Sequence, residues 1–129
     1  MIASDSAKFA DTHGKWGMSP TWGMSQRLPR RIGLLAAKEM MFSGRVIRGE
    51  EAASLGLANR CVPEDELLDA AIEMAQTFLA NSWFTLRTDK MLVNGGLQHT
   101  LADGLAFERE NSPGAGPDMA ERLAGFSKS

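Results

Sequence analysis

The pattern that most constrains the fold is one apolar face that recurs at helical spacing between residues 64 and 80. Acidic residues open the segment, where negative charge favours a helix N-terminus. The apolar face consists of Leu67, Leu68, Ala71, Ile72, Ala75, Phe78 and Leu79. A face of this kind has to be buried against another element. The segment therefore predicts an amphipathic helix within a packed structure.

Helical spacing of apolar residues, usually closed by glycine, predicts further helices along the chain. These helices are expected over residues 31–42, 50–55, 82–94 and 97–110. Asp118 and Glu121 have the spacing of a capping box and predict a short final helix. The segments read as strands are residues 7–12 and 59–62, both brief. The expected fold class is therefore mostly α with one or two short strands.

Residues 1–30 have a different character, because glycine and proline interrupt them and no helical period is sustained. We expect a short strand and loops there, with helices from Arg31 onward. The composition is that of an ordinary globular protein, with 43% hydrophobic and 23% charged residues. The chain is therefore divided into residues 1–30 and residues 31–129.

Charge and composition argue against several classes of function. A net charge of −2 gives no reason to expect nucleic acid or an anionic membrane as a partner. No apolar run approaches the roughly 20 residues that span a bilayer, and the first ten residues do not resemble a secretory signal. The single cysteine, Cys61, excludes an internal disulfide and fits a reducing cytoplasm. Two distant histidines and one cysteine predict no metal site.

One run of residues carries a family resemblance. Gly17, Pro20 and Gly23 lead into Ser25-Gln26-Arg27-Leu28-Pro29-Arg30-Arg31-Ile32-Gly33. This run resembles the G-x-x-P-x-x-G-x-[ST]-Q-R-L-P-R-x-x-G signature of the enoyl-CoA hydratase/isomerase family, the crotonases. Matches in the same order continue through Ala37-Lys38-Glu39, Ser43-Gly44-Arg45, Glu50-Glu51-Ala52 and Leu55-Gly56-Leu57-Ala58-Asn59-Arg60. The resemblance extends from Ile2 to Lys128, which is essentially the full chain.

The resemblance implies the C-terminal part of the α/β ClpP/crotonase fold, with the N-terminal sheet half absent. In the family, that half supplies the backbone N–H donors of the oxyanion hole and, in hydratases, a first catalytic glutamate. Residues 1–30 are then a remnant of the core with the active-site loop, and residues 31–129 are a helical association region. The chain alone is expected to be inactive, because such donors dominate this kind of catalysis.

The resemblance also implies chemistry on acyl-CoA thioesters in fatty acid metabolism. An enolate-like species is stabilised, and water is added or a double bond shifts, as in a lyase or isomerase. Coenzyme A is part of the substrate, and no separate cofactor is expected. Family members assemble as trimers or hexamers, so a homo-oligomer in the cytoplasm is expected. The alternative is a helical oligomerisation fragment without catalysis.

His13 occupies the position of the second hydratase glutamate, four residues before Gly17. Histidine can act as an acid or a base near neutral pH. Asp11 and Thr12 are close enough in sequence to orient the ring. Two alternatives stay open: His13 only forms hydrogen bonds within the loop, or Asp11 is itself the base.

Four further residues are candidates for binding the substrate. Trp22 lies in the turn that in relatives borders the acyl pocket, and Trp16 is an apolar neighbour in the same segment. Lys90 and Lys128 are candidates for binding the phosphates of coenzyme A. The competing interpretations are core packing for the tryptophans and simple solvation for the lysines. The Ser25-Gln26-Arg27 segment resembles the start of a helix near the site, and its role is expected to be structural.

Overall fold

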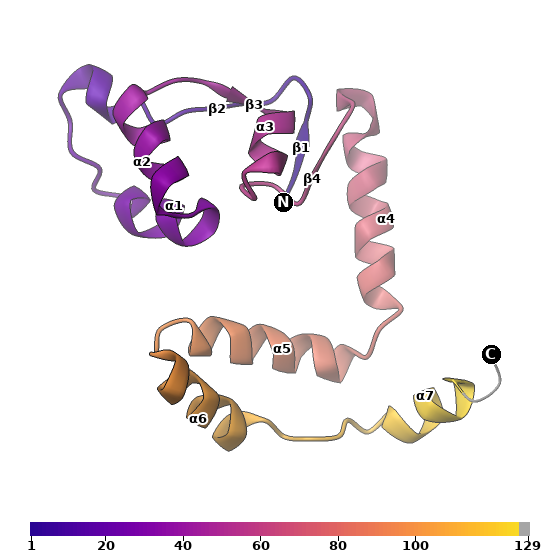
Figure 1. Cartoon of the computed structure of the whole chain (residues 1–129). Helices are drawn as coiled ribbons and strands as arrows, with labels where there is room; N and C mark the ends of the chain where they lie inside the picture. The colour runs from indigo at the N-terminus through magenta and orange to yellow at the C-terminus, as the bar shows by residue number, and fades with distance from the viewer. Residues whose placement is uncertain (127–129) are drawn as a thin grey trace. The chain divides into compact units, whose positions relative to one another are not determined.

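The computed structural model describes residues 1–126, and the chain divides into two compact units between Glu73 and Met74. The first unit contains β1 (Ile2–Ser4), β2 (Lys8–Phe9), the 3-10 turn η1 (His13–Trp16), α1 (Met24–Ile32), α2 (Leu34–Ser43), β3 (Ile47–Arg48), α3 (Gly49–Ser54), β4 (Arg60–Val62) and the 3-10 turn η2 (Glu64–Glu66). Helix α4 (Leu67–Leu79) runs through the division, and the second unit contains α5 (Trp83–Gly96), α6 (Leu101–Asn111) and α7 (Met119–Phe126) (Figure 1).

The strands form two short pairs in the first unit. β1 runs parallel to β4, with Ile2 opposite Arg60 and Ser4 opposite Val62. β2 runs antiparallel to β3 (Figure 1), which the sequence did not indicate. The expected strand at residues 7–12 is shortened to β2, because the chain turns into η1 soon afterwards. The prediction of a mostly helical chain with short strands is confirmed.

The core of the first unit is built around Ile47, which is fully buried between the strands and helices. Its buried cluster consists of Ala3, Leu28, Ala37, Met40, Ile47, Ala52 and Ala58. The small side chains allow close approach, and Gly49 shows this most clearly. A Cβ atom there would lie 2.0 Å from the carbonyl oxygen of Ser4, so the start of α3 touches β1 directly.

The expectation of loop structure up to residue 30 is wrong, because α1 already begins at Met24. Gly23 adopts a left-handed conformation at φ 85° and starts the helix. Leu28 is buried, and Met24 and Ile32 pack against the same core at four-residue spacing. This apolar face outweighs the backbone hydrogen bond that a proline inside the helix removes.

The helix expected over residues 31–42 is divided in the structure. Gly33 has φ 83° and ψ 160°, so α1 ends before it and α2 starts after it. Its N–H still donates a hydrogen bond to the carbonyl oxygen of Pro29 at 3.0 Å. Gly44, at φ 58°, ends α2 as the sequence predicted.

Helix caps fix the boundaries in the second unit. Ser82 Oγ accepts a hydrogen bond from the N–H of Thr85 and starts α5. Thr100 Oγ1 accepts one from the N–H of Asp103, so α6 begins at Leu101 and not at residue 97. Helix α6 follows α5 after a short turn, and the two pack together (Figure 1).

The predicted final helix is present as α7. The Asp118 carboxylate accepts hydrogen bonds from the Ser82 hydroxyl at 2.8 Å and from Arg122 Nε at 2.5 Å. Residues 1–30 belong to the same compact unit as α2 and α3. The roles assigned from the sequence, a core remnant with the active-site loop for residues 1–30 and an association region for residues 31–129, stay a prediction.

Candidate functional site

An aspartate–histidine pair forms in the loop after β2. Asp11 is buried, with 2% of its surface exposed. Its Oδ1 atom accepts a hydrogen bond from the backbone N–H of His13 at 3.0 Å, and His13 Nδ1 lies 2.5 Å from the same oxygen. An ionised carboxylate can only accept hydrogen bonds, so the proton of the ring is placed on Nδ1. The second ring nitrogen, Nε2, is then the one left for acid–base chemistry.

The electrostatics of this pair indicate which residue acts as the base and which one orients it. Burial raises the pKa of the Asp11 carboxyl. The hydrogen bonds from the His13 side chain and backbone, together with the charge interaction with His13, lower this pKa by more than burial raises it. The net result is a pKa below the usual value for aspartate. A carboxylate with a lowered pKa is a weak base and a good orienting group. The geometry thus favours Asp11 as the partner that positions His13.

The backbone around His13 is fixed by its own hydrogen bonds. The N–H of Lys15 donates to the carbonyl oxygen of Thr12 at 3.0 Å, and the N–H of Met18 donates to the carbonyl oxygen of His13 at 3.1 Å. Gly17 makes the turn possible, because it adopts φ 65° at the end of η1. η1 also packs against α2. The His13 ring is therefore presented from a well-braced loop.

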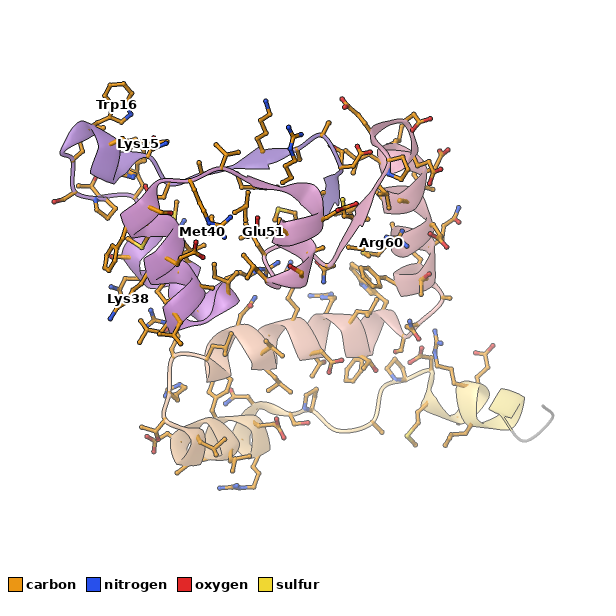
Figure 2. All side chains as sticks on the ribbon, turned by 45° about the horizontal axis from the view of Figure 1, so that its top comes forward. Lys15, Trp16, Lys38, Met40, Glu51 and Arg60 are labelled. Carbon is orange, nitrogen blue, oxygen red and sulfur yellow. The ribbon has the colours of Figure 1, made fainter. Side chains whose placement is uncertain are left out.

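The two tryptophans differ in their relation to His13. Trp22 meets the imidazole edge to face, with ring centroids 5.7 Å apart and planes inclined by 64°. Trp22 nevertheless exposes 80% of its surface, and Trp16 exposes 70%. Figure 2 shows Trp16 at the outer end of the η1 loop, pointing away from it. The structure thus brings Asp11, His13 and Trp22 together, while neither tryptophan is buried in a core.

The lysine candidates lie elsewhere in the chain. Lys90 is exposed on α5 in the second unit. Lys128 lies outside the described residues. Their proposed contacts with coenzyme A phosphates remain predictions.

A cavity of about 490 Å³ lies beside Asp11 in the first unit. Its lining consists of Lys8, Phe9, Ala10, Asp11, Met24, Arg27, Leu28, Arg31, Met40 and Leu57. The lining is apolar apart from Asp11 and three cations, and no pattern in the sequence predicted this cavity. Arg27 and Arg31 stand one helical turn apart, which is a recognisable signal once residues 24–32 are known to be helical.

A second cavity, of about 650 Å³, lies in the second unit between α5 and the segment before α7. Trp83, Phe84, Arg87 and Asp118 are among its lining residues. The hydrogen bonds of Asp118 from Arg122 and Ser82 lower the pKa of its carboxyl. Because this carboxylate is held in a structural role, the Asp11–His13 pair is the better candidate for chemistry.

Residues 1–126 contain neither a membrane-crossing helix nor a cluster of metal ligands. None of their helices is both long and apolar enough to cross a membrane. No three histidine, cysteine, aspartate or glutamate side chains in this part of the chain gather as metal ligands.

The loop, the divided helix pair and the C-terminal helices match a known family. The model of the enoyl-CoA hydratase/isomerase family matches residues 1–119. The chain belongs to this family. Its similarity to a crystal structure of enoyl-CoA hydratase from Bacillus anthracis has a TM-score of 0.90 at 35% identity, over 98% of this chain and 50% of that chain. The crotonase resemblance drawn from the sequence is thus confirmed.

Curated relatives agree with this family membership. The chain is 38% identical over 128 residues to a probable enoyl-CoA hydratase, EchA8, of Mycobacterium tuberculosis, covering 98% of this chain and 50% of the relative. It is 37% identical over 111 residues to the mitochondrial methylglutaconyl-CoA hydratase of Rattus norvegicus, covering 83% of this chain and 35% of the relative. The chain therefore spans half or less of the length of these hydratases.

Proposed function

We propose that this chain is part of an enzyme that hydrates or isomerises acyl-CoA thioesters, with His13 as its acid–base residue and Asp11 as the residue that orients it. The observation that supports this most directly is the contact between Asp11 Oδ1 and His13 Nδ1 at 2.5 Å. It leaves Nε2 of a braced imidazole available to a substrate. The relatives named as hydratases support the substrate class.

The proposed chemistry follows from this arrangement. In hydration, His13 Nε2 accepts a proton from water as the oxygen adds to the β-carbon of the acyl double bond, and negative charge develops on the thioester oxygen. The imidazolium then donates that proton to the α-carbon, which restores the thioester carbonyl and the neutral imidazole. Asp11 remains a carboxylate and stabilises the imidazolium that forms. In isomerisation, the same nitrogen moves a proton between two carbons of the acyl chain. Backbone donors for the thioester oxygen are expected from the part of the fold outside these 129 residues.

Substrate contacts are proposed for the residues named from the sequence. Trp22, in edge contact with His13, is suited to form a wall beside the reacting acyl carbons. Trp16 would extend this apolar surface, and Lys90 and Lys128 would bind phosphates of coenzyme A. Coenzyme A arrives with the substrate, so the proposed reaction needs no separate cofactor.

A homo-oligomer, trimeric or hexameric, is proposed for the same enzyme. Large apolar side chains are exposed in the second unit, and the most exposed are Leu97 at 76% and Leu101 at 82%. Contiguous apolar surface of this kind is typical of association sites. We place the enzyme in the cytoplasm and in fatty acid metabolism, although relatives include a peroxisomal and a mitochondrial hydratase.

The same exposed side chains favour a second candidate function, a helical oligomerisation fragment without catalysis. They continue along α5 and α6 through Trp83, Met91, Val93, Leu97, Leu101 and Leu105. This candidate uses the apolar surface of the second unit and gives the Asp11–His13 pair only a structural role in the loop.

Titration calorimetry with crotonyl-CoA separates the two candidates, after light scattering has established the oligomeric state. The proposed function predicts saturable binding with a Kd below about 1 mM. A folded oligomer that does not bind crotonyl-CoA would favour the oligomerisation fragment.

Turnover is tested in a chimera in which these residues replace the matching part of the Bacillus anthracis hydratase. His13→Gln should lower the hydration rate by about 100-fold or more and change the Kd little, because general acid–base catalysis contributes that much. His99→Gln, in the second unit, is the matched control. Equal rates in both variants would remove His13 from the mechanism.

A further inference from the structure

Three cations line the cavity beside Asp11 without joining the ion pairs of the described residues. These cations are Lys8, Arg27 and Arg31. The ion pairs that arginines form within residues 1–126 are instead those of Arg45, Arg60 and Arg122. Asp11 Oδ1 is already engaged as a hydrogen-bond acceptor by His13. The three cations of the cavity thus form no ion pair with an acidic side chain of residues 1–126.

The two arginines are held at the cavity by their surroundings. Arg27 lies over Gly23, where its Nε would be 3.2 Å from an added Cβ atom. Arg31 Nη2 lies 3.5 Å from the carbonyl oxygen of Leu57, at the outer limit for a hydrogen bond. Like charges one turn apart on a helix repel each other. A bound anion would relieve this repulsion, and a planar carboxylate suits the fork geometry of a guanidinium.

The rest of the lining indicates which chemical group is attached to the bound anion. The cavity that the cations and Asp11 line is otherwise apolar, through Phe9, Met24, Leu28, Met40 and Leu57. Such a surface favours a hydrocarbon chain. The ligand that fits both features has an apolar chain with a negatively charged end.

We propose that this cavity binds the acyl group of thioesters whose chain ends in its own carboxylate, and that Arg27 and Arg31 bind that carboxylate. The inference rests on the proposed function, because it places the reacting carbons near His13. Lys8 adds positive charge at the same cavity. Arg27 thus gains a binding role, in place of the structural role expected from the sequence.

Calorimetry with glutaryl-CoA, butyryl-CoA and coenzyme A tests this assignment on the purified chain. We expect glutaryl-CoA to bind about tenfold more tightly than butyryl-CoA, the effect of one charge-assisted contact. Arg27→Gln and Arg31→Gln should each abolish the preference and leave butyryl-CoA binding unchanged. Arg30→Gln is the matched control, because Arg30 is on the same helix and donates to the Gln26 carbonyl oxygen at 2.8 Å.

The three ligands distinguish a failure of this inference from a failure of the proposed function. Equal binding of glutaryl-CoA and butyryl-CoA would overturn this inference and leave the proposed function standing. Weaker binding of coenzyme A itself in the arginine variants would assign the cations to its phosphates and also overturn the inference. If a folded chain, verified by circular dichroism, binds neither thioester, both proposals fail.

Discussion

Gly95 of α5 lies directly against the ring of Phe107 of α6, so closely that an added Cβ atom would be 2.4 Å from Cζ of the ring. The Phe107 ring also stacks on His99, with centroids 5.5 Å apart. This contact holds the two helices together, because Gly95 has no side chain and the Phe107 ring therefore packs directly on the backbone of α5.

Gly95→Ala is therefore expected to destabilise the second unit. Overpacking typically costs about 1–3 kcal/mol, which exceeds the gain in helix propensity of about 1 kcal/mol. Gly96→Ala is the control, because nothing lies within 4 Å of its Cβ position. Urea denaturation followed by circular dichroism should show a loss for the first variant only. Equal stability of both variants would contradict the packing described.

The close approach of Gly49 to β1 predicts that a substitution at Gly49 changes the reactivity of the Cys61 thiol. An added Cβ would lie 2.9 Å from Cys61 Sγ as well as against the Ser4 carbonyl. Gly49→Ala should lower the free energy of unfolding by about 3 kcal/mol. Because the backbone must move, the single thiol should also react faster with a disulfide reagent.

The wild-type thiol is expected to react slowly at neutral pH. Burial raises the pKa of Cys61, and the nearby carboxylates of Glu50 and Asp5 raise it further. The thiolate is the reactive form, so its small population limits the rate. Ser54→Ala, at the exposed end of α3, should leave the rate unchanged. A Gly49→Ala variant with the wild-type rate would show that α3 and β1 are not locked together.

The Asp11–His13 pair predicts a pH-dependent stability. The pKa of Asp11 in the folded chain lies below its ordinary value of 3.8. Asp11 therefore stabilises the folded state in full at pH values above 3.8. This stabilisation is lost as the pH falls from there through the folded pKa. Asp11→Asn should flatten this part of the curve of unfolding free energy against pH, measured by urea denaturation.

Asp11→Ala should also destabilise the first unit by about 1–3 kcal/mol near neutral pH, because the partly buried N–H of His13 loses its acceptor. Parallel curves for wild type and Asp11→Asn between pH 6 and pH 3 would argue against the buried pair.

Ser82 joins two helices and should be sensitive to truncation. Its hydroxyl oxygen caps α5 by accepting from Thr85, and the hydroxyl donates to Asp118 before α7. Ser82→Ala should cost about 1 kcal/mol in a thermal or urea transition, as the loss of an N-cap does. Ser82→Thr keeps the hydroxyl and should retain most of the stability. Equal losses in both variants would point to packing as the cause.

The local pattern of apolar and polar residues was sufficient to predict much of the helical structure. The apolar period of residues 64–80 predicted one helix there, and the structure has the 3-10 turn η2 followed by α4, which ends at Leu79. The order of motifs identified the family, and the match over residues 1–119 confirms it. The position of His13 relative to Gly17 selected the catalytic candidate, and the structure shows that Asp11 contacts it.

The errors fall where distant packing outweighs local preference. The glycines and prolines of residues 1–30 obscured the helical period of α1, and only the family resemblance suggested that a helix starts near Ser25. The helix α1 exists because Leu28 and its neighbours are buried on a core contributed by β1, β3 and α2. The pairing of β2 with β3 was equally invisible, since a two-residue strand carries no periodic signal.

Local patterns along the chain were enough to identify the family, the helical segments with a clear apolar face and the residue types available for acid–base chemistry. The burial of Asp11, its contact with His13 and the gathering of Lys8, Arg27 and Arg31 at one cavity became visible only in three dimensions. Burial, a lowered pKa and unpaired charge all depend on which side chains come together in space. Periodicity along the chain reports only how each segment faces its surroundings.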